Sequence, residues 1–228
     1  MEKLNVLIAC EYSGIVRTAF ENLGHRVISC DLLPSERTGR HYQGNVLDIL
    51  YKENYDLMIG HPPCTFLSYA ANKYFNEEIY GAKAREREIL KQEGIEFFLK
   101  LWNAPIKHIC LENPKGYICR VIKQTQVIHP YFFGENEVKQ IFLWLKNLPP
   151  LVHTKQPTLF EPQSHIPLPE PKYISKNGDK IYRTQAISGT NKDRSKERSR
   201  FFVSIADAMA LQWTQYICGD TPSISQAL

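Results

Sequence analysis

The sequence has no apolar run long enough to cross a membrane, because a spanning helix needs about 20 consecutive apolar residues. Its polar start, Met-Glu-Lys-Leu-Asn, and the short apolar run that follows do not match a secretory signal peptide. No segment repeats along the chain. A chain of 228 residues can bury one good core with a small additional region. We therefore expect a cytoplasmic protein with one main domain and no membrane partner.

Cysteine is present, but its spacing excludes two common arrangements. The six cysteines, at positions 10, 30, 64, 110, 119 and 218, are widely scattered and include no C-x-x-C pair. Zinc sites and disulfide frameworks usually show such spacing. We expect reduced thiols and no bound metal.

A strong excess of one charge is also absent. The formal net charge is +4, and the contents of 43% hydrophobic and 23% charged residues are ordinary for a globular protein. A balance this mild does not by itself indicate a nucleic-acid partner. Function must therefore be inferred from particular residues and from where the charges gather.

The most informative stretch is Asp56-Leu-Met-Ile-Gly-His-Pro-Pro-Cys64. A short apolar run after an acid predicts a buried strand, and the prolines end it because they fix φ and lack an amide donor. Ligands bind beyond the carboxyl ends of strands in open α/β sheets, so Cys64 is expected to face a substrate there. The alternative is a small buried cysteine, the commoner position of a free thiol.

A second predicted strand ends in the same way and adds a carboxylate. The stretch His108-Ile-Cys-Leu-Glu112-Asn-Pro is again an apolar run stopped by proline. It would bring Glu112 to the edge of the sheet that carries Cys64. A thiol and a carboxylate at neighbouring strand ends suit covalent attack on an electron-poor ring that must also be protonated.

The N-terminal part has the order strand, glycine turn, helix. Residues 4–9 predict a strand, Gly14 ends a turn, and the apolar spacing after it predicts a helix that stops near Gly24. The next strand ends in Asp31, at the distance expected of an acid that binds a ribose in a nucleotide-binding fold. A lone glycine is a weak fingerprint, so a simple turn remains open. Asp48 precedes the Cys64 strand, and taken alone it could be a helix cap.

The remaining chain divides into regular elements and a proline-rich region. The expected elements in order are a mobile loop over the site at 69–78, helices at 83–102 and 116–124, strands at 127–133 and 138–145, a loop or small subdomain at 150–171, and a last helix from 201, packed on the body and followed by a frayed tail.

A basic run near the C terminus is a candidate for phosphate contact. Between residues 188 and 200 the cations outnumber the acids, and Ser, Thr and Gly are interleaved. Such a run is usually a solvated face, and binding of nucleic acid is the competing interpretation. Its cations are Lys192, Arg194, Lys196, Arg198 and Arg200.

The order of these motifs resembles the C5-cytosine DNA methyltransferases, especially their short phage-borne relatives. The shared features are the glycine turn, the acid after the second strand, Asp48, Pro-Pro-Cys-x-x-x-Ser and Glu-Asn-Pro. The resemblance covers residues 4–145 and returns at 200–210. It implies an α/β fold with a Rossmann-like class I methyltransferase sheet, helices on both faces and a small irregular C-terminal subdomain. Its parts would be a core at 1–149, a small DNA-contacting region at 150–198, and a helix at 199–218 that returns to the core.

The resemblance also implies a cofactor, a partner and site residues. These are S-adenosylmethionine and DNA containing cytosine, with the target base flipped or single-stranded, bound by a monomer. Cys64 would be the nucleophile, Glu112 would hold the base, and Lys139 would be the cation of a strand that carries arginine in the family. The implied cofactor-binding residues are Glu11, Tyr12, Ser13, Gly14, Asp31, Asp48 and Pro62. The implied DNA-binding residues are Ser68, Lys192, Arg194, Lys196, Arg198 and Arg200.

The chain also departs from the family pattern, and two other functions stay open. Its first turn lacks the family's aromatic residue and second glycine, and the large recognition domain is missing, so we expect a short or relaxed target sequence. Pro-Pro-Cys is also similar to the Pro-Pro-aromatic loop of enzymes that methylate N4 of cytosine or N6 of adenine, although Glu112 would then have no role. The other alternative is a catalytically silent nucleic-acid-binding accessory protein.

Overall fold

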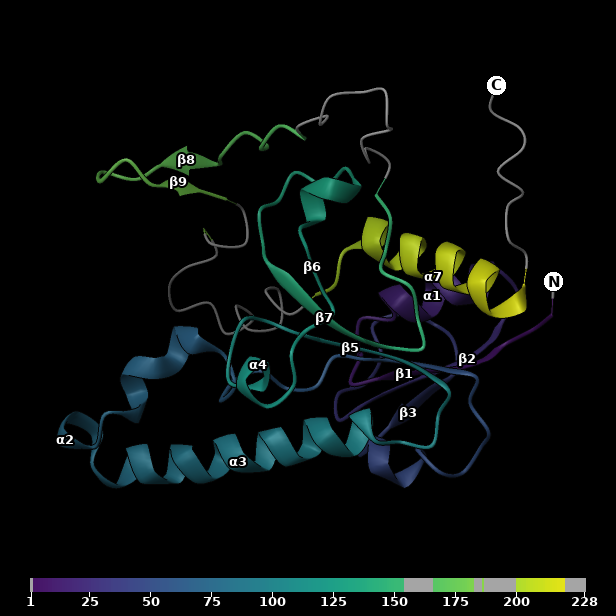
Figure 1. Cartoon of the computed structure of the whole chain (residues 1–228), viewed down its shortest axis with the longest axis horizontal. Helices are drawn as coiled ribbons and strands as arrows, with labels where there is room; N and C mark the ends of the chain where they lie inside the picture. The colour runs from purple at the N-terminus through teal and green to yellow at the C-terminus, as the bar shows by residue number, and fades with distance from the viewer. Residues whose placement is uncertain (1, 154–165, 183–185, 187–199, 220–228) are drawn as a thin grey trace.

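A computed structural model describes residues 2–153, 166–182, 186 and 200–219, and its main feature is a seven-stranded sheet (Figure 1). The strand order is β3-β2-β1-β4-β5-β7-β6. The first five strands pair in parallel, and β7 runs antiparallel to both β5 and β6. The order 3-2-1-4-5 is that of a Rossmann-like sheet. The strands are β1 (Asn5–Ala9), β2 (Arg26–Asp31), β3 (His41–Gln43), β4 (Leu57–Gly60), β5 (His108–Asn113), β6 (Gln126–Ile128) and β7 (Ile141–Lys146).

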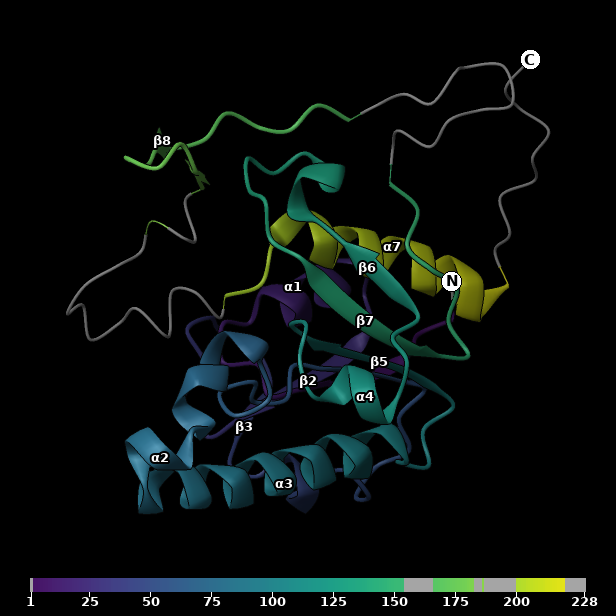
Figure 2. The same cartoon turned by 60° about the vertical axis from the view of Figure 1, so that its left-hand side comes forward.

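Helices cover both faces of this sheet. Helices α1 (Ile15–Asn22) and α7 (Val203–Cys218) lie on one side, and α3 (Ala82–Trp102) and α4 (Ile118–Val121) on the other (Figure 1, Figure 2). Because successive side chains of a strand point to opposite faces, Val6 and Ile8 share a core with α1 and α7, whereas Leu7 and Ala9 share one with α3 and α4. The predicted α/β class, with helices on both faces, is confirmed.

Helix α7 is fixed to the body by apolar packing and by a buried histidine. Trp213 is fully buried among core residues. His25 Nδ1 accepts a hydrogen bond from the Leu4 amide at 3.2 Å, and its Nε2 lies 2.7 Å from Thr214 Oγ1. Burial lowers the pKa of His25, which favours the neutral ring that this acceptor role requires. These contacts hold the C-terminal helix beside the first strand.

The segment expected to be a mobile loop at 69–78 is instead helical. It forms the 3₁₀ helix η2 (Tyr69–Phe75) and the short helix α2 (Glu77–Tyr80). Ser68 Oγ accepts a hydrogen bond from the Ala70 amide at 3.3 Å, and Asn76 Oδ1 accepts one from the Glu78 amide at 2.9 Å. Side-chain caps of this kind satisfy the first amides of a helix, and they explain why the segment is ordered.

Other boundaries also differ from the sequence-based expectations. The strand expected at 127–133 ends after β6, and Pro130 opens the 3₁₀ helix η3 (Pro130–Phe133) because proline suits a first helical position. The helix expected at 116–124 is reduced to α4. Strand β3, the 3₁₀ helix η1 (Val46–Asp48), and a hairpin of β8 (Tyr173–Ile174) and β9 (Lys180–Ile181) were not predicted. Within the described residues, no helix combines the length and apolar character needed to span a membrane.

Candidate active site

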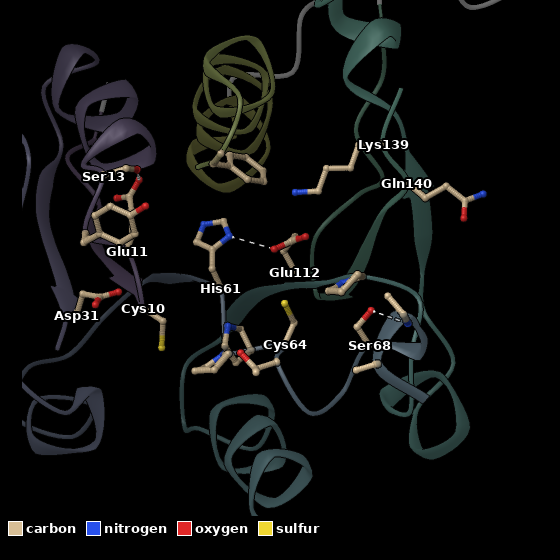
Figure 3. A pocket seen from close by; sticks show the side chains of 18 of the residues that line it. Cys10, Glu11, Ser13, Asp31, His61, Cys64, Ser68, Glu112, Lys139 and Gln140 are labelled. Carbon is tan, nitrogen blue, oxygen red and sulfur yellow. Dashed lines mark hydrogen bonds and ion pairs between the residues drawn. The ribbon is translucent and has the colours of Figure 1, made fainter. Parts of the chain in front are cut away.

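One pocket opens at the carboxyl ends of β1, β2, β4 and β5 (Figure 3). Its volume is about 1050 Å³, close to the upper end of the roughly 300–1,000 Å³ typical of small-molecule sites. The structure brings most of the predicted site residues together here. Those that line the pocket are Glu11, Tyr12, Ser13, Asp31, Pro62, Cys64, Ser68, Glu112 and Lys139.

The loop that carries Cys64 is held from both sides. The amides of Leu67 and Ser68 both donate to the Cys64 carbonyl oxygen at 3.0 Å. On the other side, Asn113 Nδ2 donates to the Pro62 carbonyl oxygen at 2.8 Å, and Asn113 is almost fully buried. Cys64 itself is exposed, and its Sγ points toward the space beside Glu112 (Figure 3). The fold therefore presents this thiol on a well-braced turn.

Glu112 is ionised by its surroundings. The side chain is only 15% exposed, and its Oε2 lies 3.5 Å from His61 Nδ1. Burial alone would raise its pKa, but the hydrogen bond with His61 and the charges of Lys139 and His61 outweigh burial and lower the pKa. At neutral pH the pocket therefore contains a carboxylate flanked by the nitrogen-bearing side chains of His61 and Lys139 (Figure 3).

His61 lies between the two halves of the pocket. It follows β4 directly, and its amide donates to the Ala9 carbonyl oxygen at 2.9 Å. Its ring packs against Phe201, just before α7, with ring centres 4.7 Å apart. Nε2 is buried and has no hydrogen-bond partner among the described residues. Figure 3 shows the ring between the Glu11 loop and Glu112, where it can influence ligands on either side.

The loop between β1 and α1 is shaped by Glu11. This buried carboxylate accepts hydrogen bonds from the amides of Val16 at 2.7 Å and Arg17 at 3.2 Å, so it caps the start of α1. Gly14 has φ +68°, and a Cβ there would meet Arg17 Nη2 at 2.9 Å. Gly14 thus lies behind the pocket lining. The carboxylate of Glu11 builds the loop, while Tyr12 and Ser13 face the pocket beside it.

The two acids predicted to bind the cofactor differ in position. Asp31 lines the pocket at the end of β2, and its Oδ1 accepts a hydrogen bond from the Leu33 amide at 2.9 Å. Asp48 lies away from the lining, in η1, where its Oδ2 accepts a hydrogen bond from the Tyr42 hydroxyl at 3.2 Å. The residue that caps η1 is Asn45, so the interpretation of Asp48 as a helix cap is wrong.

Several lining residues were not identified from the sequence. Cys10 has φ +58°, and burial, together with Asp31 and Cys30, raises the pKa of its thiol, so this thiol stays protonated. Cys10 directly follows β1, which was the one available signal. His129 gave no signal, because its segment was expected to be a strand. The other missed residues include Leu33, Tyr74 and Gln140.

The predicted basic run can be placed only at its end. Lys192, Arg194, Lys196 and Arg198 lie outside the described residues. Arg200 pairs with Glu36 at 2.8 Å, away from the pocket lining. The hydrogen bond and charge of Glu36 raise the pKa of Arg200. In the described ranges, no cluster of His, Cys, Asp or Glu is arranged to hold a metal ion.

Three solved structures are similar to parts of this chain. A candidate DNA modification methyltransferase encoded within a prophage of E. coli is 13% identical, with 63% of this chain and 46% of that chain covered and a TM-score of 0.39. The methyltransferase EhMeth of Entamoeba histolytica is 15% identical, with 68% and 56% covered and a TM-score of 0.44. WbdD, crystallised with a kinase inhibitor, is 11% identical, with 66% and 38% covered and a TM-score of 0.39.

This chain thus spans between 38% and 56% of the length of the three similar structures. Similarity at this level carries no argument about activity. No protein-family model matches the sequence, and no curated protein matches it.

Proposed function

We propose that this protein transfers the methyl group of S-adenosylmethionine to C5 of cytosine in DNA, through a covalent bond between Cys64 and C6 of the base. The observation that carries the proposal is the placement of the Cys64 thiol and the Glu112 carboxylate against one pocket. His61 and Lys139 adjoin the same carboxylate. A nucleophile, a carboxylate and a proton donor in one pocket are what this reaction requires.

The chemistry explains the pairing of thiol and carboxylate. C5 of cytosine is a poor nucleophile until the Cys64 thiolate forms a bond to C6. The electrons of the C5–C6 double bond then shift toward C4, the C4–N3 double bond opens, and N3 takes up a proton. C5 has become an enamine carbon and can accept a methyl group. Loss of the C5 proton to water re-forms the double bond and releases the Cys64 thiolate.

The proton for N3 is best supplied by His61 through Glu112. Because Glu112 is an anion at neutral pH, it has no proton of its own to give. Its Oε2 is 3.5 Å from His61 Nδ1, and an imidazole ring can carry a proton on either of its nitrogens. A proton passed from His61 to Glu112 reaches N3, and it returns when the C4–N3 double bond re-forms. The carboxylate would also accept a hydrogen bond from the exocyclic N4 amine of cytosine.

The other half of the pocket fits a nucleoside cofactor. Asp31 supplies a carboxylate for the ribose hydroxyls, and the loop of Tyr12 and Ser13 forms the adjoining wall. The orphaned Nε2 of His61 is a further polar atom with unmet hydrogen-bonding capacity on this side. S-adenosylmethionine bound here would supply the electrophilic methyl group. The base would enter from the Cys64 side, either flipped out of a duplex or from a single strand.

Product analysis tests the proposal against methylation of an exocyclic amine. The protein is incubated with S-adenosylmethionine labelled in its methyl group and with DNA, and the nucleosides are separated after digestion. The proposal predicts label in 5-methyldeoxycytidine and none in the Cys64→Ser variant. Label in N4-methyldeoxycytidine or N6-methyldeoxyadenosine would overturn the proposed chemistry. Absence of any label, with S-adenosylmethionine binding intact, would favour the accessory-protein alternative.

A further inference from the structure

Two segments beside the pocket form one exposed surface of cations and tyrosines. A β-bridge joins Ser68 to Gly116, and the Tyr69 amide donates to the Lys115 carbonyl oxygen at 3.3 Å. Only glycine allows this approach, because a Cβ on Gly116 would overlap the Leu67 carbonyl oxygen. We use the term arginine–tyrosine surface for the group Tyr69, Lys73, Tyr74, Lys115 and Arg120.

Two of the three cations of this surface, Arg120 and Lys73, lie against aromatic rings. Arg120 Nε donates to the Tyr69 hydroxyl at 2.9 Å, and its guanidinium lies 5.3 Å from the centre of the same ring. Lys73 Nζ lies 5.0 Å from the ring centre of Tyr74. A charged side chain that is already ordered loses less conformational freedom when an anion binds. The surface is therefore prepared for a negatively charged ligand.

The surface has a fixed position relative to Cys64. Arg87, from α3, lies 4.8 Å from the ring centre of Phe66 and 5.3 Å from those of Tyr74 and Phe75. Its Nη2 donates to the carbonyl oxygen of Thr65, the residue after Cys64, at 3.2 Å. One guanidinium thus ties η2 and the nucleophile loop to the same helix.

The charges of these segments favour a polyanion. Residues 64–76 and 113–123 contain four cations and no acidic residue. On the adjoining helices α2 and α3, Glu77 and Glu88 are paired with Arg85 and Lys91. A basic surface interleaved with aromatic rings is the pattern by which proteins hold single-stranded nucleic acid, with phosphates on the cations and bases on the rings.

We propose that the arginine–tyrosine surface binds the nucleotides that adjoin the target base on its own strand. Phosphates lie beside Lys115 and Arg120, and a neighbouring base stacks on Tyr74, which is 41% exposed and also lines the pocket. The inference rests on the proposed function, since it takes the pocket to be the site of a target base. It places the strand across η2 and α4, independently of the basic run at 192–198.

Binding of a fluorescein-labelled single-stranded oligonucleotide, with one cytosine in a thymine background, tests this placement by fluorescence anisotropy. Replacing Lys115 and Arg120 by glutamine should weaken binding about tenfold at low salt and reduce the slope of log affinity against log salt by about 1.4, from two lost phosphate contacts. Tyr74→Leu keeps apolar bulk without the flat ring, and it should weaken binding at least fivefold. The matched control replaces Lys100, in the last turn of α3, and Lys107, just before β5, by glutamine. Both are exposed and neither lines the pocket, so this variant should bind as the wild type does.

Calorimetric titration with S-adenosylmethionine separates this inference from the proposed function. The Lys115/Arg120 variant and the control pair, none of whose changed residues lines the pocket, should bind S-adenosylmethionine as the wild type does, which also shows that they are folded. If the surface variants bind the oligonucleotide like the wild type, or lose no more than the control pair, the inference is overturned. If they lose oligonucleotide binding but the protein neither binds S-adenosylmethionine nor methylates cytosine, the proposed function fails and the strand-binding surface stands.

Discussion

His61 Nδ1 lies 3.5 Å from Glu112 Oε2, and this contact joins the ends of two neighbouring strands. In the parallel pairing of β4 with β5, Gly60 is opposite Leu111. The next residue of each strand, His61 and Glu112, therefore comes to the same place at the edge of the sheet. The register alone puts an imidazole ring beside the carboxylate, on the loop that also carries Cys64.

Removal of His61 should raise the pKa of Glu112. Burial favours the protonated acid, and His61 and Lys139 oppose it. In His61→Ala, Lys139 would be the only one of these two groups left to oppose burial, so Glu112 should be protonated at a higher pH. Carbon-13 NMR of the glutamate carboxyl groups measures this pKa directly. His129→Ala, which removes another pocket histidine, is the control and should leave the pKa in place. An unchanged value in His61→Ala would show that the contact does not govern the carboxylate.

The same shift predicts how stability depends on pH. The pKa of Glu112 is lowered in the folded protein from a usual value of 4.5. A group with a lowered folded-state pKa contributes stability that is fully present above the unfolded-state pKa and is lost as the pH falls through the folded-state pKa. The difference in free energy of unfolding between the wild type and Glu112→Gln should be constant near neutral pH. Below about pH 4.5 the wild type should lose stability relative to Glu112→Gln. Urea titrations at a series of pH values would reveal it, and a constant difference down to acidic pH would contradict it.

Asp31 should contribute strongly to binding of S-adenosylmethionine. Loss of a charge-assisted hydrogen bond costs about 1.5–3 kcal/mol, so Asp31→Asn should weaken binding roughly ten- to a hundredfold. Asp48→Asn is the comparison, because Asp48 lies away from the pocket lining and contacts Tyr42. Isothermal titration calorimetry compares the two. If Asp48→Asn weakens binding as much as Asp31→Asn, the cofactor lies differently from our placement.

Asn113 should act by positioning Cys64. Its Nδ2 donates to the Pro62 carbonyl oxygen at 2.8 Å. Asn113→Ala leaves that carbonyl without this partner, which should cost about 1–3 kcal/mol of stability. We expect slower methyl transfer with unchanged affinity for S-adenosylmethionine, as measured by single-turnover kinetics and calorimetry. Equal losses in rate and affinity would indicate general damage to the pocket instead.

Local sequence patterns predicted the features that depend on chain direction and strand ends. Proline after an apolar run identified where β4 and β5 stop. These two strand ends were enough to predict that Cys64 and Glu112 lie at the same edge of the sheet. The alternation of predicted strands and helices along the chain likewise predicted the α/β class. These features follow from steric limits of the backbone, which are local.

Features that depend on contacts distant in sequence could not be predicted in this way. The pairing of His61 with Glu112 depends on strand register. The helical structure of 69–78 depends in part on Arg87, twelve residues beyond Phe75, which packs its guanidinium against the rings of Phe66, Tyr74 and Phe75. The role of Glu11 as a cap of α1 was missed for a different reason. Its contacts are local, but a carboxylate in a turn can bind a ligand or a helix amide equally well.

The most direct test of the account is a covalent adduct between Cys64 and a trapped base. DNA containing 5-fluorodeoxycytidine is mixed with the protein and S-adenosylmethionine. A base can remove a proton from C5 but cannot remove fluorine in the same way, so the Cys64–C6 bond persists. We expect a complex that survives denaturation and maps to Cys64 by mass spectrometry. Cys218→Ser, which changes a thiol at the end of α7, should form it equally, and Cys64→Ser should not form it. No adduct in a wild-type protein that methylates cytosine, or an adduct that persists in Cys64→Ser, would contradict the assignment of Cys64 as the nucleophile.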